Sequence, residues 1–362
     1  MRNLLQRLAA SALPALPTLC ALGGALLMFV VFLALQGEPA LEACKLIYVG
    51  AFGSGFAWQN TLQRAAPLML TALCVALPAR AGLVIIGGEG ALALGGLASA
   101  VVPLMLPAAF PATPMLLLMG LAAMLAGGLW ITFAGALRQF RGINETIGSL
   151  LLSYIALAVF RHLVEGPLRD PGSLNKPSTP PLAPEYLIGS LPGLDVHWGL
   201  FWGVLACVAA HILVRQGIFG FSMAVVGGNA RAARLVGLPV NRIILTACVL
   251  GGAAAGLAGM MEIAAVHGSA NSALLAGYGF SGILVAFAAR QNPLAIIVCA
   301  LLIGGIEASG SLLQRRLDLP DATTTVLQGL LFVNLLAWEA LTGRLSAWRL
   351  RLHTPRQEVV HA

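Results

Sequence analysis

Charged residues are scarce in this chain. Only 10% of its 362 residues are Asp, Glu, Lys or Arg, whereas ordinary soluble domains carry about 25%. The 21 basic and 14 acidic side chains are too few to cover the water-exposed surface of a chain of this length. Hydrophobic residues make up 59% instead. This composition excludes an ordinary soluble protein and predicts that a lipid bilayer surrounds most of the chain.

Motifs that carry chemistry are lacking as well. The sequence has no P-loop, no HExxH pair and no GxSxG elbow, so we expect neither nucleotide hydrolysis nor any other enzymatic activity, and no catalytic residues. The six cysteines form no CxxC pair, so we expect no metal and no cofactor. Basic residues are scattered singly between apolar stretches, and this pattern argues against nucleic acid as a partner.

Apolar runs of about 20 residues, the length that crosses a bilayer, recur along the chain. We therefore expect an all-α, polytopic membrane protein with about 10 transmembrane helices. The eighth run is only about half a crossing long, so we leave open whether it spans the membrane fully. The predicted spans are 16–36, 60–79, 82–106, 114–137, 143–164, 197–214, 243–264, 278–290, 293–310 and 323–341.

Lys and Arg collect on one side of these spans. If the N-terminus is inside, fourteen of the 21 basic residues fall in inside segments, a bias typical of the cytoplasmic face. We expect both termini in the cytoplasm, with a cytosolic N-terminus at 1–15 and a cytosolic tail at 342–362. The transmembrane domain at 16–341 then contains a Pro-rich extracytoplasmic loop at 165–196 and a cytosolic loop at 215–242.

Glycines interrupt two of the spans in corresponding places. Ten spans divide into two five-helix halves, and an odd number per half inserts the second half in the opposite direction, as in inverted-repeat transporters. The third span of each half carries a glycine cluster, Gly87–Gly90 in the first and Gly277–Gly282 in the second. Paired broken helices favour a solute site near the middle of the membrane, and close helix crossing is the alternative explanation. Glu89 either serves function or holds helices together by hydrogen bonds.

The inside loop at 215–242 contains a short predicted helix. Asn229 is a good N-cap, Gly237 suits the position just after the helix end, and Pro239 prevents continuation. A helix of two turns is unstable alone in water. It must therefore pack against its own membrane domain or against a separate cytosolic partner.

The order and spacing of several stretches resemble a known family. The chain resembles the membrane permease subunits of ABC importers for simple sugars and nucleosides, within the branched-chain amino acid/ribose permease superfamily. The resemblance extends from about residue 60 to about residue 340. The stretches that carry it are Arg80–Leu83 with Gly87–Gly90, Gly142–Ile147, Gly220–Phe221 with Ala232–Arg234 and Gly237, Ala255–Gly259, and Gly277–Phe280 with Asn292–Leu294.

This resemblance implies partners. Permeases of this kind work in pairs, as two copies or with a related permease, in a bacterial plasma (inner) membrane. Each permease binds a cytosolic ATPase, and an extracytoplasmic solute-binding protein delivers the solute. The short helix then resembles the coupling helix that sits in the ATPase. The residues expected to couple to the ATPase are Asn229, Arg231, Ala233, Arg234 and Gly237.

The resemblance also implies where the solute passes. The expected pathway residues are Gly87, Gly88, Glu89, Gly90, Asn144, Ser153, Tyr278, Phe280 and Ser281. Three family amides are replaced here by Ile86, Ala91 and Ser153, so the solute stays open between a nucleoside, a nucleobase-like compound and a simple sugar. An ion-coupled secondary transporter is the alternative function, although it would need paired ionisable residues in mid-membrane.

Overall fold

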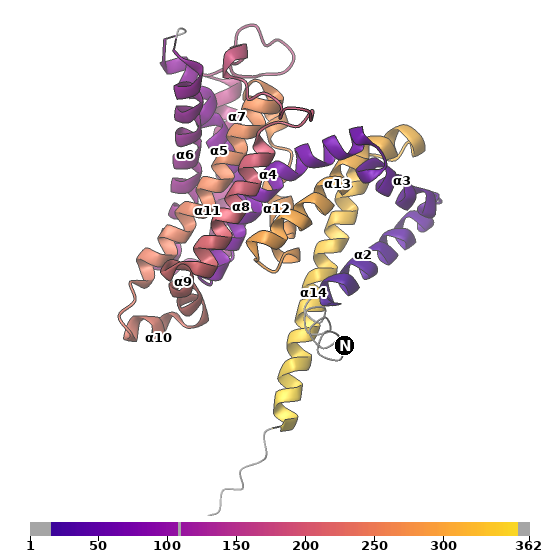
Figure 1. Ribbon diagram of the computed structural model, residues 1–362, viewed down its shortest axis with the longest axis vertical. Coiled ribbons are helices and arrows are strands. Elements are labelled where there is room, and N and C mark those ends of the chain that lie inside the picture. Colours follow the sequence, from indigo (N-terminus) through magenta and orange to yellow (C-terminus); the bar gives the residue numbers. More distant parts are fainter. Residues whose placement is uncertain (1–15, 108–109, 354–362) are drawn as a thin grey trace, which may run out of the picture. The chain divides into compact units, whose positions relative to one another are not determined.

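The computed structural model describes residues 16–107 and 110–353, and helices account for most of them (Figure 1). The only β-structure in these residues is two isolated bridges, Ser178 with Asn271 and Ser190 with His197. The α-helices are α2 Leu16–Leu35, α3 Ala40–Phe52, α4 Gly55–Arg80, α5 Gly88–Met105, α6 Ala112–Arg141, α7 Glu145–Glu165, α8 Gly199–Gln216, α9 Ile218–Gly228, α10 Ala230–Leu235, α11 Val240–Glu262, α12 Tyr278–Ala288, α13 Pro293–Leu317 and α14 Ala322–His353. Short helices of other types are η1 Pro184–Tyr186, η2 Ile263–His267 and η3 Ser272–Leu274.

The chain forms two compact units. The smaller comprises Met1–Leu46 with Gly310–Ala362, and in it α2 packs along α14. The larger, Ile47–Ser309, contains the helices from α4 to α12 and all the residues discussed below as a site. The expected N-terminal segment 1–15 lies outside the described residues, and α14 continues through the expected tail as far as His353.

The all-α, membrane-spanning fold is confirmed, but the count of ten is not. Seven of the described helices are long and apolar enough to cross a membrane, and four further apolar helices are shorter. Two helices lie where the sequence predicted connections: α3, and α9 within the predicted loop 215–242. The prediction missed both because a search for runs of about 20 apolar residues overlooks helices of 13 and 11 residues.

Glycine brings α5, α6 and α11 together at their backbones. A Cβ atom on Gly95 would collide with Gly256, and one on Gly127 would collide with Gly252 and Gly256. A Cβ on Gly96 would lie 3.1 Å from the carbonyl oxygen of Gly259. Small residues are what membrane helices use for close crossing, because lipid supplies no hydrophobic force to press larger surfaces together. The glycines of α11 are therefore packing residues.

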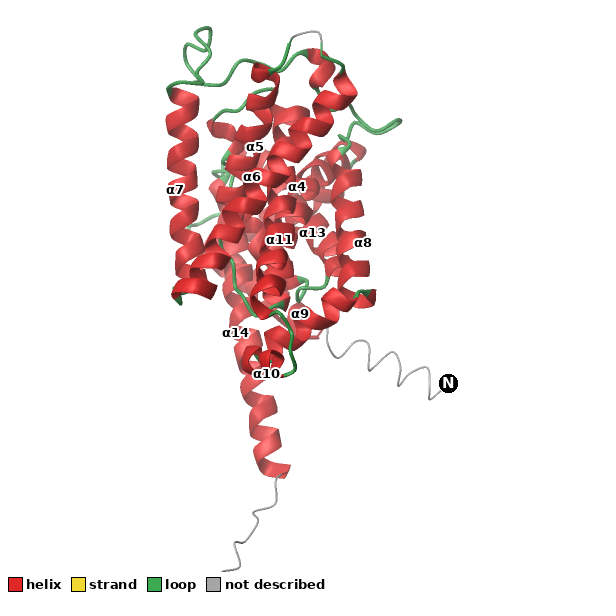
Figure 2. Cartoon of the chain, turned by 90° about the vertical axis from the view of Figure 1, so that its left-hand side faces the viewer, coloured by secondary structure: helices red, strands yellow, loops and turns green. Residues whose placement is uncertain are grey.

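The segment between α7 and α8, here called the cap (residues 166–198), covers one end of the larger unit. Figure 2 shows it at the end of the bundle opposite α10. Backbone N–H groups of Thr179, Leu182 and Ile188 donate to the carbonyls of Ala270, Gly268 and Ala264 at 2.8–3.0 Å. The Gln63 side chain of α4 donates to the Asp195 carbonyl at 2.6 Å. The cap is thus fastened both to α4 and to the connection that leads into α12.

His197 is a buried residue at the point where the cap meets α8. Its Nδ1 accepts the N–H of Gly199 at 3.1 Å. Its Nε2 is buried and has no hydrogen-bond partner among the described residues. Burial lowers the pKa of His197 below its usual value, and the Gln63 carbonyl offsets part of this shift. The folded protein therefore keeps the neutral imidazole.

We predict that stability falls as pH drops below about 6.5, the ordinary pKa of histidine. The unfolded chain then binds a proton that folded His197 excludes, so up to about 1.4 kcal/mol is lost per pH unit until the lowered folded pKa is reached. His197→Asn keeps an acceptor for Gly199 N–H but cannot titrate. Between pH 7.5 and pH 5, the melting temperature of this variant should fall by less than that of the wild type. An equal fall in both proteins would assign the effect to other groups.

Candidate functional site

Two interrupted helices meet inside the larger unit, and Glu89 joins them. Glu89 lies in the first turn of α5 and is only 2% exposed. One carboxyl oxygen accepts the N–H of Gly277 at 3.0 Å, and the other accepts the N–H of Gly279 at 2.6 Å. These groups open α12, so the carboxyl group lies at the positive ends of two helix dipoles. Of the two explanations for Glu89, the structure supports hydrogen bonds that hold helices.

The two glycine clusters touch. A Cβ atom on Gly279 would collide with the backbone of Glu89, and one on Gly282 would lie 2.8 Å from the Cβ of Thr71. Thr71 of α4 also donates its hydroxyl to the carbonyl of Tyr278 at 3.0 Å. The start of α12 is therefore held between α4 on one side and α5 on the other.

Three hydroxyl groups of α7 support the unwound stretch before α5 and the first turn of α5. The hydroxyl of Thr146 donates to the carbonyl of Val84 at 3.1 Å. Ser149 accepts the N–H of Ile86 at 2.9 Å, and buried Ser153 accepts the N–H of Gly90 at 3.4 Å. We call Thr146, Ser149 and Ser153 the hydroxyl row. It supplies the hydrogen bonds that unwound backbone would otherwise lack in a bilayer.

The short helix α12 passes through the larger unit together with the connection before it. That connection is bonded to the cap through Ala270. At the far end of α12, the guanidinium of Arg80, the last residue of α4, donates to the carbonyl of Gln291 at 3.2 Å. Because Gln63 marks the cap end of α4 and Arg80 its other end, the chain passes from one end of the bundle to the other between Ala270 and Gln291.

Several residues expected in the pathway make contacts that hold the helices. Asn144 caps α7, its side-chain oxygen accepting the N–H groups of Thr146 and Ile147 at 3.0 and 3.1 Å. A Cβ on Gly90 would lie 2.9 Å from the Cα of Ser153, so this glycine permits close contact between α5 and α7. The first turn of α12 differs, because Phe280 is 37% exposed.

Further expected pathway residues belong to the same junction. A Cβ on Gly87 would lie 2.8 Å from Ile131, and one on Gly88 would lie 3.4 Å from the carbonyl oxygen of Gly279. Ser281 donates its N–H to the carbonyl of Gly277 at 2.9 Å. The structure thus brings the two glycine clusters and Ser153 into one junction, while Asn144 lies at the start of α7.

The predicted short helix is α10. Asn229 caps it, accepting N–H groups of Arg231 and Ala232 at 3.0 Å each. Gly237 follows its end with a φ of 82°, as predicted. Arg231 and Arg234 are exposed, but Ala233 is fully buried and so is turned away from any docking surface. Leu235, 90% exposed, extends from the same surface and was not predicted.

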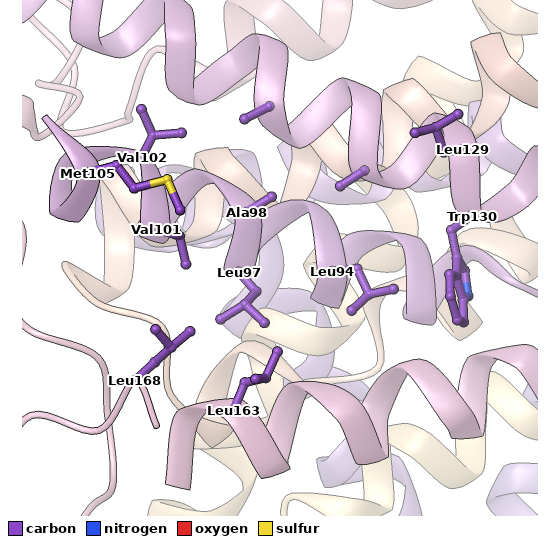
Figure 3. A pocket seen from close by; sticks show the side chains of 12 residues that line it. Leu94, Leu97, Ala98, Val101, Val102, Met105, Leu129, Trp130, Leu163 and Leu168 are labelled. Atoms are coloured by element: carbon purple, nitrogen blue, oxygen red, sulfur yellow. The ribbon is translucent and has the colours of Figure 1, made fainter. Parts of the chain in front are cut away.

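An apolar hollow lies apart from this site, between α5, α6 and α7 (Figure 3). Leu94 and Leu97 of α5 line it together with Leu163 of α7 and Trp130 of α6. The Trp130 N–H has no hydrogen-bond partner in the described part of the chain. Because this lining offers almost no polar group, the hollow does not suit a water-soluble solute.

The fold and the junction together define a class: a polytopic helical membrane protein built around interrupted helices, as transporters are. Comparison with known families identifies it further. The chain belongs to the family described as the branched-chain amino acid transport system permease component, whose model matches residues 58–336. The protein is therefore the membrane-spanning permease component of an ABC transporter, which implies an ATPase partner. An ion-coupled secondary transporter is not favoured.

Individual relatives agree with this assignment. A glucose ABC transporter permease of Haloferax volcanii is 34% identical over 89% of this chain and 87% of its own. A guanosine ABC transporter permease of Bacillus subtilis is 29% identical over 78% of this chain and 80% of its own. A nucleoside ABC transporter permease of Lactococcus lactis is 24% identical over 87% of this chain and 89% of its own.

We predict that Glu89→Ala destabilises the larger unit markedly. The N–H groups of Gly277 and Gly279 would lose their acceptor, and each unsatisfied buried donor costs about 1–3 kcal/mol. The melting temperature of the detergent-solubilised protein should fall by about 5 °C or more. Glu89→Gln keeps one carbonyl oxygen as an acceptor, so its melting temperature should fall by an intermediate amount.

Glu145→Ala is a matched control for the loss of a carboxyl group. Glu145 pairs with Arg138 at 3.3 Å, and the Arg138 side chain is 46% exposed. Such partly exposed pairs contribute about 1 kcal/mol or less. Equal melting shifts for Glu89→Ala and Glu145→Ala would contradict the role given to Glu89.

Proposed function

We propose that this permease forms the pathway by which a neutral, polyhydroxylated solute, a simple sugar or a nucleoside, is imported with energy from a separate ATPase. The observation that carries the proposal is α10, a capped surface helix with exposed arginines. The names of the relatives support both solute classes, and a sugar ring is common to glucose and guanosine.

The surface of α10 fits a protein partner. Arg231 and Arg234 present positive charge, and Leu235 with Val236 presents an exposed apolar tip. Exposed apolar groups that are contiguous and rimmed by charge are typical of interaction sites. The capped helix packs on its own domain through Ala233 and leaves the rest of its surface free for the ATPase. Asn229 and Gly237 define its two ends.

The remaining partners and the topology complete the proposal. A second permease, either a copy or a related chain, pairs with this one in the bacterial inner membrane. The solute-binding protein docks on the cap side, so the loop 165–196 lies outside the cell. The loop 215–242 and both termini then lie in the cytoplasm. The transmembrane permease domain is then 16–341, and solute passes beside Tyr278, Phe280 and Ser281 at the start of α12.

We predict that the double variant Arg231→Glu with Arg234→Glu loses the ATPase or its coupling to transport, because reversed charges repel the surface that the arginines attract. The permease should still insert and keep its melting temperature, since both side chains are exposed. The measurement is the amount of ATPase that co-purifies with the tagged permease, together with uptake.

A pair of exposed basic residues on the cap provides the control. Arg169→Glu with Lys176→Glu changes the charge equally at the opposite end of the larger unit and should leave the ATPase bound. Undiminished ATPase binding and uptake in the Arg231/Arg234 variant would overturn the docking role of α10.

The solute class is tested with the whole transporter, binding protein included, in liposomes. Labelled glucose and guanosine should be tested separately for ATP-dependent uptake, with leucine as a control solute. We expect saturable uptake of one of the first two and none of leucine, because the relatives are named for glucose and guanosine. Uptake of leucine alone would refute the proposed solute class.

A further inference from the structure

Arg80 lies where the docking region meets α12. The C-terminal end of α9, just before the docking helix α10, packs on the last residue of α4: a Cβ on Gly227 would collide with the Arg80 carbonyl. Gly82, which has a φ of 83°, forms the other side of this contact. A Cβ atom on Gly82 would lie 3.3 Å from the Cα of Gly227. No side chain separates the two backbones here, so a displacement of α9 must move Arg80.

The Arg80 side chain continues the connection to α12. Its guanidinium donates to the carbonyl of Gln291 in the turn that ends α12. In this turn the N–H of Gln291 bonds the Ala286 carbonyl and the N–H of Arg290 bonds the Phe287 carbonyl, at 2.9 Å each. This is the helix ending that normally uses glycine.

The turn is strained because it contains no glycine. Arg290 and Gln291 adopt φ values of 50° and 57°, which side chains disfavour. Non-glycine residues keep such a conformation only when their surroundings hold it. A charge-assisted bond from Arg80 to the turn is such a restraint.

The opposite end of α12 reaches the junction of the interrupted helices. Glu89 accepts the N–H groups of Gly277 and Gly279 at that end, and the Thr71 hydroxyl donates to the Tyr278 carbonyl. Because α12 has 11 residues, it is a rod of about 16 Å. Movement of one end displaces the other, where Phe280 is exposed.

We propose that Arg80 is a positioning residue for transport, which passes displacement of the ATPase-docking segment α9–α10 to α12 and so to the pathway. This inference rests on the proposed function of α10. It predicts that loss of the Arg80 side chain separates ATP hydrolysis from transport without releasing the ATPase.

The test uses the complete transporter in liposomes. Arg80→Ala should keep the ATPase bound and hydrolysing while solute moved per ATP falls by at least about fivefold, the smallest effect expected for allosteric coupling. Arg80→Lys should recover part of the loss, because one ammonium can still reach the Gln291 carbonyl. Arg215→Ala, in the last turn of α8 beside Arg80, is the charge-matched control and should stay coupled.

Hydrogen exchange separates a relay from a merely structural role. In the wild type, ATP should change exchange in both 229–237 and 286–292; in Arg80→Ala the first change should persist and the second should disappear. An unchanged transport-to-hydrolysis ratio, or a persisting change at 286–292, overturns the relay. Loss of ATPase binding in Arg80→Ala also overturns it, because the side chain would then serve docking. If instead the Arg231/Arg234 variant stays coupled while Arg80→Ala does not, the docking proposal fails and Arg80 acts from another surface.

Discussion

A bilayer offers no water to backbone that leaves a helix, and this constraint governs the interior of the larger unit. The chain interrupts helices before α5 and before α12, and each exposed backbone group needs a partner. Glu89 supplies two acceptors to the start of α12, and the hydroxyl row supplies bonds to Val84, Ile86 and Gly90. Without these side chains, the interruptions that bring the two glycine clusters together would be too costly to maintain.

Much of the fold follows from composition alone. Runs of apolar residues located the long helices, although one end of α5, α13 and α14 lies six to twelve residues from its predicted position. The capping residues Asn229 and Gly237 located α10. The prediction missed the helices α3 and α9 because their length does not distinguish them from loop segments. Whether 278–290 spans the membrane fully stays open, and the bonds at Ala270 and Gln291 show that the connection before α12 adds to the length of the passage through the larger unit.

The candidate site was harder to predict than the fold. The sequence placed Glu89 among glycines but could not show which backbone groups it would meet, since its partners lie some 190 positions away. Ser149 was missed, and Thr146 was noted only as part of the stretch Gly142–Ile147, because small hydroxyl residues are common in membrane helices. They become informative only when their spacing is compared with a neighbouring unwound segment. Ala233 was predicted to face a partner because helix length alone does not reveal which side of α10 is buried.

The glycine crossing of α5, α6 and α11 has a mechanical consequence. Where helices meet through Gly95, Gly127 and Gly256, no side chains can change rotamer to accommodate sliding. Shear between packed helices proceeds by such small side-chain adjustments, so these three helices form a block that resists shear. Rearrangement during a transport cycle must then occur around this block, which makes it the fixed frame against which the other helices move.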